Sequence, residues 1–162
     1  MKRKSLMKIA VFSDTHGSTA RMLRAVRELR PDALVHLGDY ERDADCLERE
    51  FPDTPLYRVC GNCDVSPRAP QELVVEFGAV RALLCHGHRY AVDWGRLDSM
   101  VYAAQEKGCA LVLYGHTHRA ENAEMGGVRL VNPGTAGVGP ARSFALTEIF
   151  ENGGVAAEIR PL

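Results

Sequence analysis

The sequence predicts an α/β fold in which mixed β-sheets lie between helices. Two observations lead to this prediction. The first half of the chain alternates apolar runs with amphipathic stretches in the order β-α-β-α-β, which is typical of a parallel sheet covered by helices. The second half contains strands that follow one another through glycine turns. With 162 residues, the chain suits a single domain, 1–162, that buries a substantial core.

The elements of the first half are bounded by helix caps and prolines. The apolar run 8–13 predicts a strand. Ser18 or Thr19 can cap a helix that runs to about Arg30, and Pro31 ends it. The other elements predicted here are a strand at 33–37, a short charged helix at 41–50 and a strand at 56–60.

The second half begins with a predicted hairpin, 72–77 and 80–85, which turns at Gly78-Ala79. Apolar residues at helical spacing predict a helix over 94–107, and Gly108 stops it. The remaining predicted strands are 110–114, 120–125, 128–132, 144–150 and 155–159.

The composition is that of an ordinary globular protein, with 46% hydrophobic and 25% charged residues. A net charge of -1 gives no support for nucleic-acid or membrane attraction. The basic start of the chain is not followed by the apolar segment and cleavage site of a signal peptide, and no run approaches the ~18 apolar residues of a membrane helix. We expect a cytoplasmic protein.

The five cysteines are an odd number and lie mostly in or beside apolar runs, which favours reduced, buried thiols over a disulfide framework. Cys60 and Cys63 formally make a CxxC pair, so a redox or structural zinc role is an alternative. However, a second pair and the flanking residues typical of such sites are missing.

Polar clusters that contain glycine follow five of the predicted strands. In open α/β sheets the loops at the carboxyl ends of strands converge, and glycine permits close approach of backbone and ligand. Five of the six histidines fall in these clusters, whereas His36 lies inside an apolar strand and is expected to be a packed core histidine. The candidate site residues are Asp14, His16, Asp39, Asn62, His86, His116 and His118.

His116 and His118 are two residues apart just after an apolar strand. In an extended chain, residues i and i+2 point to the same side, so both imidazoles can face one site. Surface histidines, helix caps and turn residues remain alternatives for each cluster considered singly.

Carboxylate, amide and imidazole ligands without thiolate suit borderline divalent metals such as Mn, Fe, Co, Ni or Zn. Seven ligands are too many for one tetrahedral ion, but they suit two ions roughly 3.5–4 Å apart that share a carboxylate. Two such ions leave positive charge after two aspartates and a bridging hydroxide are counted, which favours an anionic phosphate ester.

The order of these clusters resembles the calcineurin-like metallophosphoesterases. The resemblance spans residues 14–118 in the motifs Asp14-Thr15-His16, Gly38-Asp39, Gly61-Asn62-Cys63-Asp64, His86 and Gly115-His116-Thr117-His118. The later Asn132-Pro133-Gly134-Thr135 resembles the Asn-Pro-Gly-Ser/Thr segment of the small YfcE-type phosphodiesterase family.

This resemblance implies a four-layer α/β/β/α sandwich and two divalent metal ions, with Mn²⁺ as the first expectation and Ni²⁺, Co²⁺, Fe²⁺ or Zn²⁺ as alternatives. It also implies the nucleophile, a metal-bridging hydroxide that attacks phosphorus in line, so no side chain is expected to act as the nucleophile. The implied ligand sets are Asp14, His16 and His118 for one ion and Asn62, His86 and His116 for the other, with Asp39 shared.

One position departs from much of the superfamily, which has histidine where this chain has Cys63. A thiol is a poorer hydrogen-bond donor than imidazolium, so we expect weak phosphomonoesterase activity and a preference for diesters with good leaving groups. His88 either replaces the missing group or orients a neighbouring ligand. Expected substrate contacts are Asn62, Cys63 and His88.

The sequence therefore predicts a metal-dependent phosphodiesterase that acts on a small phosphodiester, with the oligomeric state left open. The alternative is a non-catalytic protein-binding scaffold on the same fold, like the retromer subunit. A nuclease is a third reading, but no basic patch or extra domain is evident to guide a strand.

Overall fold

The computed structural model describes residues 4–162, so the first three residues of the basic start lie outside the described residues. Its strands form two five-stranded sheets. In spatial order, the first sheet contains β10 (Val155–Pro161), β9 (Ser143–Phe150), β1 (Ser5–Phe12), β2 (Ala33–His36) and β3 (Leu56–Arg58). The second contains β4 (Glu72–Phe77), β5 (Val80–Cys85), β6 (Leu111–Leu113), β8 (Val128–Asn132) and β7 (Glu121–Met125).

Both sheets are mixed, as the sequence predicts. In the first sheet β1, β2 and β3 are parallel, while β9 and β10 are antiparallel neighbours. In the second sheet β5, β6 and β8 are parallel, and hairpins add β4 and β7 at the edges. The connections between parallel strands contain α1 (Ala20–Leu29), the 3-10 turn η1 (Glu41–Ala44), α2 (Asp45–Glu50), the 3-10 turns η2 (His88–Tyr90) and η3 (Val92–Trp94), and α3 (Asp98–Glu106).

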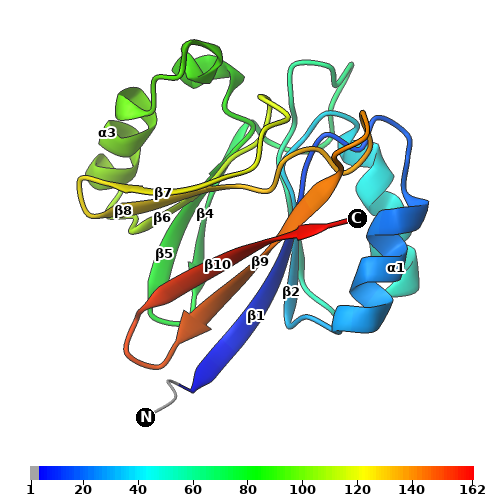
Figure 1. Cartoon of the computed structure of the whole chain (residues 1–162), viewed down its shortest axis with the longest axis horizontal. Helices are drawn as coiled ribbons and strands as arrows, with labels where there is room; N and C mark the ends of the chain where they lie inside the picture. Colours follow the sequence, from blue (N-terminus) through cyan, green and yellow to red (C-terminus); the bar gives the residue numbers. More distant parts are fainter. Residues whose placement is uncertain (1–3) are drawn as a thin grey trace.

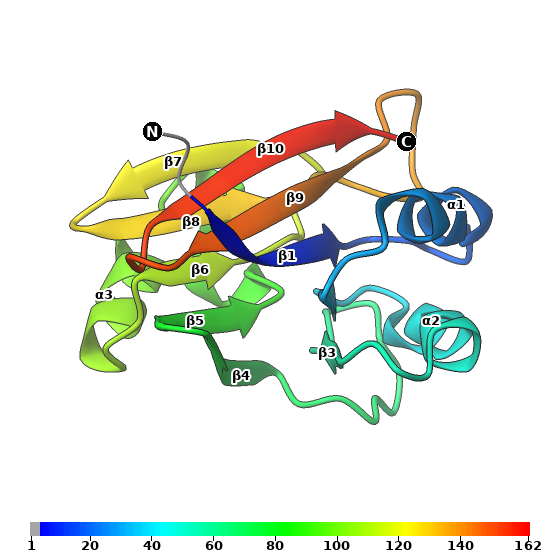
Figure 2. The same ribbon diagram turned by 90° about the horizontal axis from the view of Figure 1, so that it is seen from below.

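The two sheets lie against each other with helices on their outer faces, so the predicted four-layer sandwich is confirmed. Figures 1 and 2 show α1 and α2 outside the first sheet and α3 outside the second. No helix within residues 4–162 combines the length and apolar character needed to cross a bilayer.

Three hydrophobic clusters correspond to the three interfaces between these layers. On β1, Ile9 and Val11 face the second sheet, whereas Ala10 and Phe12 face α1 and α2. On β5 and β6 the same alternation divides side chains between the inter-sheet core and α3. This period of two explains why the central strands are continuous apolar runs: both of their faces are buried.

Three sequence predictions need correction. The helix predicted over 94–107 begins at Asp98, because Ala91 and Gly95 adopt left-handed φ values of 56° and 69° and the chain forms η2 and η3 instead. The helix predicted over 41–50 is divided into η1 and α2. Thr19 occupies the N-cap position of α1, but its side chain makes no capping hydrogen bond.

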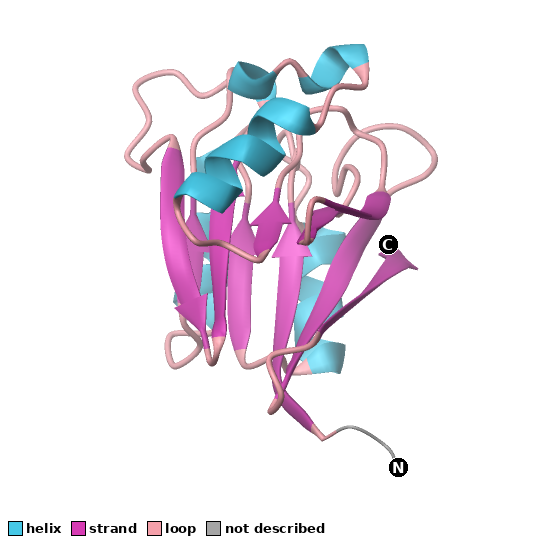
Figure 3. Ribbon diagram, turned by 90° about the vertical axis from the view of Figure 1, so that its left-hand side faces the viewer, coloured by secondary structure: helices cyan, strands magenta, loops and turns pink. Residues whose placement is uncertain are grey.

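Loops and short helical turns gather at one end of the strands (Figure 3). The strands that precede the predicted ligands end at this edge, and the following loops are joined across the two sheets by hydrogen bonds. His116 N–H, from the loop after β6, donates to Asp14 Oδ2 at 3.1 Å, and His86 Nδ1, after β5, lies 2.7 Å from the Leu37 carbonyl oxygen, after β2. This edge therefore brings the candidate site residues together.

Candidate metal centre

Two buried aspartates form the middle of the site. Asp14 follows β1 and Asp39 follows β2, and their exposed fractions are 0% and 3%. A buried carboxylate is costly unless cations, metal ions or hydrogen bonds compensate it. Four of the predicted ligands offer donor atoms that all lie within 4.8 Å of one another: Asp14, His16, Asp39 and His118.

Asp39 lies between two histidines and turns one oxygen toward each. His16 Nε2 is 3.5 Å from Asp39 Oδ2, and His86 Nε2 is 3.3 Å from Asp39 Oδ1. The Nδ1 atom of His86 is 2.7 Å from the Leu37 carbonyl oxygen, so it donates there and Nε2 faces the carboxylates. A carboxylate with one oxygen on each side is suited to lie between two ions.

The charges of this centre are strongly coupled. Burial acts to raise the pKa of Asp39, but hydrogen bonds from His86 and from the Cys63 N–H outweigh burial and hold the pKa well below its usual range. Burial lowers the pKa of His86, but the Asp39 and Asp14 carboxylates outweigh it and raise this pKa. The site therefore favours an anionic Asp39 beside a cation.

The His118 and His116 imidazoles have different neighbours. His118 Nε2 is 3.2 Å from Asp14 Oδ1, whereas the His116 ring centroid is 5.1 Å from that of His86. Their φ values are 59° and 72°, so the expectation of an extended chain here is wrong. A left-handed turn, and not a strand, directs the two imidazoles.

The outer side of His116 contacts a carboxylate that the sequence analysis missed. Asp93, in η3, has Oδ2 at 2.8 Å from His116 Nε2. Carboxylates commonly orient metal-binding histidines in this way. With Nε2 engaged, Nδ1 of His116 is the nitrogen available to a ligand. No regular spacing in the sequence links Asp93 to His116.

The predicted substrate contacts lie around the same centre. Asn62 and Cys63 are exposed, and the Asn62 amide is 3.6 Å from the Cys63 sulfur, so the structure brings the Asn62 side chain to Cys63 rather than to Asp39. His88 lies beside the His86 and His116 rings, with centroids at 5.4 Å and 6.0 Å. Burial, and then the charges of these two histidines, lower the pKa of His88.

The five cysteines are free, and Cys60 is buried while Cys63 is exposed. Burial, and then hydrogen bonding to Asp39, raise the pKa of Cys63. The group of potential metal ligands found within the described residues contains no cysteine, and a thiol with a raised pKa is a poor nucleophile, which argues against the zinc and redox interpretations of the CxxC pair.

Backbone strain is concentrated in the loops that contain the predicted metal ligands. Nine non-glycine residues within 4–162 have a positive φ. Five of the nine are predicted ligands: Asp14, His16, Asp39, His116 and His118. Such conformations cost of order 1–3 kcal/mol each and are concentrated in functional sites.

Several polar atoms at the centre are buried without hydrogen-bond partners. These atoms include Asp14 Oδ1, His16 Nε2 and His86 Nε2. Orphaned carboxylate and imidazole lone pairs that converge on one place are the donor set of a divalent metal site. The residues present therefore fit divalent metal ions.

Residues 7–152 match the family model of the calcineurin-like phosphoesterase superfamily domain. The chain belongs to this superfamily.

The predicted family relationship is thus confirmed, and similar proteins support it. A probable metallophosphoesterase, YsnB of Bacillus subtilis, is 30% identical over 132 residues, which cover 80% of this chain and 75% of the relative. A predicted phosphoesterase from Streptococcus pneumoniae has a similar structure, with a TM-score of 0.72, 25% identity and coverage of 100% and 99% of the two chains.

Two more distant structures share the fold. Vps29 from Entamoeba histolytica, solved with Zn²⁺, gives a TM-score of 0.74 at 22% identity, with coverage of 96% and 99%. An archaeal phosphodiesterase gives a TM-score of 0.72 at 19% identity, with coverage of 95% and 100%.

The Asn132-Pro133-Gly134-Thr135 segment supports the loops that contain the predicted ligands without joining the cluster. The buried Asn132 amide donates to the Gly115 carbonyl and the Thr117 hydroxyl, both at 3.0 Å. The Thr135 hydroxyl donates to the Asp14 carbonyl at 2.9 Å. The segment thus connects the loops of both sheets.

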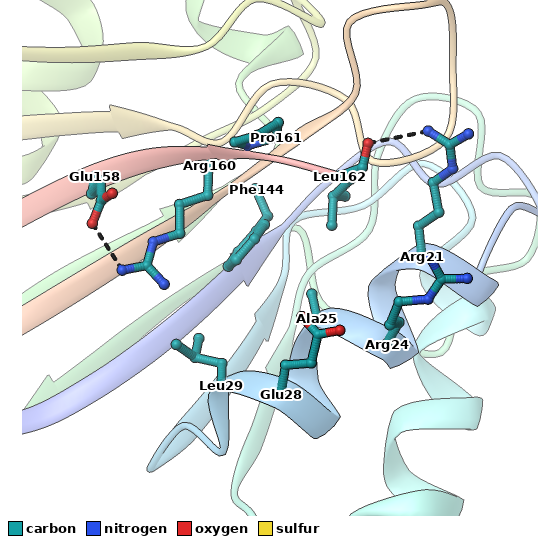
Figure 4. Close-up of a pocket in the computed structure, with 10 residues that line it drawn as sticks. All are labelled: Arg21, Arg24, Ala25, Glu28, Leu29, Phe144, Glu158, Arg160, Pro161 and Leu162. Carbon is teal, nitrogen blue, oxygen red and sulfur yellow. Dashed lines mark hydrogen bonds and ion pairs between the residues drawn. The ribbon is translucent and has the colours of Figure 1, made fainter.

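A cavity of about 860 Å³ lies elsewhere, between α1 and the ends of β9 and β10 (Figure 4). None of the predicted ligands lines it. Two of its arginines are engaged, Arg21 with the Leu162 carbonyl and Arg160 with Glu158. The cavity does not belong to the metal centre.

Proposed function

We propose that this calcineurin-like phosphoesterase is a dinuclear metal-dependent phosphodiesterase. The observation that supports this proposal most directly is the arrangement at Asp39, whose two oxygens face His16 and His86 on opposite sides. A shared carboxylate between two imidazoles is what a pair of ions 3.5–4 Å apart requires.

The proposed ligands divide into two sets around Asp39. Asp14, His16 and His118 would hold one ion, and Asn62, His86 and His116 would hold the other. When bound, two divalent ions supply a hydroxide nucleophile near neutral pH and neutralise charge on the phosphate. We propose Mn²⁺ as the native metal, with Ni²⁺, Co²⁺, Fe²⁺ and Zn²⁺ as alternatives that the same donor set accepts.

The side chains proposed to contact substrate are Asn62, Cys63 and His88. Because its pKa is lowered, His88 is neutral near pH 7 and can donate one hydrogen bond to a phosphate oxygen. A protonated Cys63 is a weak donor, so the chain gives little help to a poor leaving group. The weak donor supports small aryl-type diesters over monoesters as substrates. We also propose a cytoplasmic location, which suits the free thiols.

Asp39→Ala tests the proposal because it removes the shared ligand. The variant should lose both metal equivalents and hydrolysis of bis(4-nitrophenyl) phosphate, by at least about 100-fold, since metal-activated water is the nucleophile. Asp53→Ala is the control, because Asp53 is exposed between α2 and β3, away from the cluster. Near-wild-type turnover by Asp39→Ala in metal-controlled buffer would refute the site.

A non-catalytic scaffold is the second candidate, and the similarity to Vps29, a vacuolar protein sorting protein, favours it. One measurement distinguishes the scaffold from the phosphodiesterase. Full metal occupancy without turnover of any phosphate ester, across Mn²⁺, Ni²⁺ and Co²⁺, would support the scaffold and exclude the phosphodiesterase.

A further inference from the structure

Tyr40 has an unusual backbone conformation beside the metal centre. It follows Asp39 directly, and the φ values of the two residues are 69° and 55°. A left-handed conformation is uncommon for a bulky residue. Asp64 stabilises it here, because its Oδ1 atom accepts the Tyr40 N–H at 2.8 Å and the Glu41 N–H at 2.9 Å.

This conformation places the side chains of Glu41 and Tyr40 in different environments. Glu41 is fully buried, whereas 47% of Tyr40 is exposed. The tyrosine ring lies against His16, with centroids 5.1 Å apart and planes tilted by 53°. His16 is in turn 5.5 Å from the His118 ring. Tyr40 therefore adds an accessible aromatic surface to the His16 side of the cluster.

The ring has no evident role in the core. Within the described residues, Tyr40 belongs to none of the three hydrophobic clusters. Its loop is already anchored through backbone N–H groups by Asp64, and Gly17 N–H donates to Asp43 at 2.7 Å nearby. Strain that persists without a gain in packing points to a functional use of the exposed ring.

We propose that Tyr40 is a specificity-determining residue that stacks on an aromatic substituent of the phosphodiester. The inference rests on the proposed function, because the phosphate must lie at the metal cluster for its substituent to reach this ring. A flat substituent beside the His16–Tyr40 pair gains offset or edge-on aromatic contact, which a methyl group lacks.

Binding of two phosphinate anions tests the inference without turnover. Diphenylphosphinate and dimethylphosphinate have the same charge and contain no ester bond, and calorimetry on the Mn²⁺-loaded protein gives their dissociation constants. Tyr40→Ala should weaken diphenylphosphinate binding about two- to tenfold, the range for one aromatic pair, and change dimethylphosphinate binding less than about twofold. Tyr40→Phe should retain the wild-type preference because it retains the ring.

Two further variants control for indirect effects. Tyr40→Asn also removes the ring but tolerates a left-handed backbone, so it should lose the same preference while remaining folded. Tyr102→Ala removes an exposed aromatic residue from α3 and should leave the preference unchanged.

An unchanged preference in Tyr40→Ala and Tyr40→Asn would overturn the inference, and so would an equal loss for both anions. Turnover of bis(4-nitrophenyl) phosphate by the wild type separates this failure from that of the proposed function. If the wild type hydrolyses the diester and the preference does not depend on Tyr40, the stacking role alone is wrong.

Discussion

The Asp64 carboxylate fixes the backbone of Asp39, since its Oδ2 atom accepts the Asp39 N–H at 3.0 Å. The same oxygen accepts the Gly61 N–H at 2.7 Å, and the other oxygen accepts two further N–H groups from the Asp39 loop. One side chain thus connects the loops after β2 and β3. The position of Asp39, the proposed shared ligand, therefore depends on a residue outside the proposed ligand set.

Asp64→Asn should weaken metal binding without unfolding the protein. The amide nitrogen cannot accept a hydrogen bond, so at least one of the N–H groups loses its partner, at a cost of about 1–3 kcal/mol. Titration of Mn²⁺ into the metal-free variant should show an affinity about tenfold or more below the wild type. The matched control is Asp32→Asn, because Asp32 also accepts a backbone N–H, from Lys8 at 2.7 Å. Equal Mn²⁺ affinities for the two variants would contradict this role.

Gly61→Ala should displace the Asp39 carboxylate. A Cβ atom at Gly61 would overlap Asp39 Oδ1 and lie 3.0 Å from His86 Cδ2. Metal analysis should find the variant depleted of metal. Gly153→Ala, in the turn before β10, is the control: φ there is +79° and the added Cβ meets nothing within 4 Å. That variant should lose about 1–2 kcal/mol of stability from backbone strain and keep its metal. Full metal content in Gly61→Ala would show that the carboxylate tolerates the displacement.

His36 should lower the free energy of unfolding at acidic pH. The expectation of a core histidine is confirmed: it is fully buried, its Nδ1 accepts the Gly38 N–H at 3.2 Å, and Nε2 is 3.0 Å from the Thr15 hydroxyl. Burial lowers its pKa from 6.5 to about 4; the Asp64 carboxylate opposes this shift to a smaller extent, and the Arg58 cation adds to it.

Because the pKa of His36 is lowered in the folded state, the free energy of unfolding decreases as the pH falls. The unfolded chain binds a proton to this histidine below about pH 6.5, whereas the folded chain does so only below about 4. Stability from neutral His36 is therefore complete above pH 6.5 and lost between 6.5 and 4, by up to about 3 kcal/mol. Urea denaturation of metal-free wild type and His36→Gln across this range should give a shallower slope for the variant. If the free energies of unfolding of the two proteins change in parallel with pH, His36 is not the source of the acid-dependent loss of stability.

Metal removal should lower thermal stability. Binding to the folded state at a free concentration of a hundred times Kd adds about 2.7 kcal/mol per site. In a chain of this length, about 2.7 kcal/mol corresponds to a rise in Tm of roughly 5–10 °C for each occupied site. Differential scanning calorimetry with EDTA and then excess Mn²⁺ measures the shift, and Asp39→Ala should show none. An unchanged Tm in the wild type would indicate that the orphaned donor atoms do not bind the ion.

Most of the fold could be predicted from the sequence because both faces of the central strands are buried. The runs at β1, β5 and β6 are therefore continuously apolar, and glycine turns mark the hairpins. The pairing of the two sheets was implied only by the family resemblance, since it depends on contacts between distant segments. The start of α3 was missed because Trp94 looks helical by spacing, whereas Ala91 and Gly95 adopt left-handed conformations.

The site was predictable in its residue types and less so in its geometry. Histidine and aspartate beside glycine at strand ends identified the four residues that converge, including Asp14 and His118. Asp93 and Tyr40 could not be found in this way, because their positions depend on irregular turns with no sequence period. The left-handed turn at His116 likewise has no signal beyond the preceding glycine.

We propose that two divalent ions at the Asp39 site support phosphodiester hydrolysis. Titration of Mn²⁺ into metal-free protein, with turnover of bis(4-nitrophenyl) phosphate followed at each step, tests it most directly. We predict that turnover rises from the uncatalysed level and reaches its maximum at two equivalents of Mn²⁺ per chain. Two bound equivalents with no turnover, or full turnover at one equivalent, would contradict the claim.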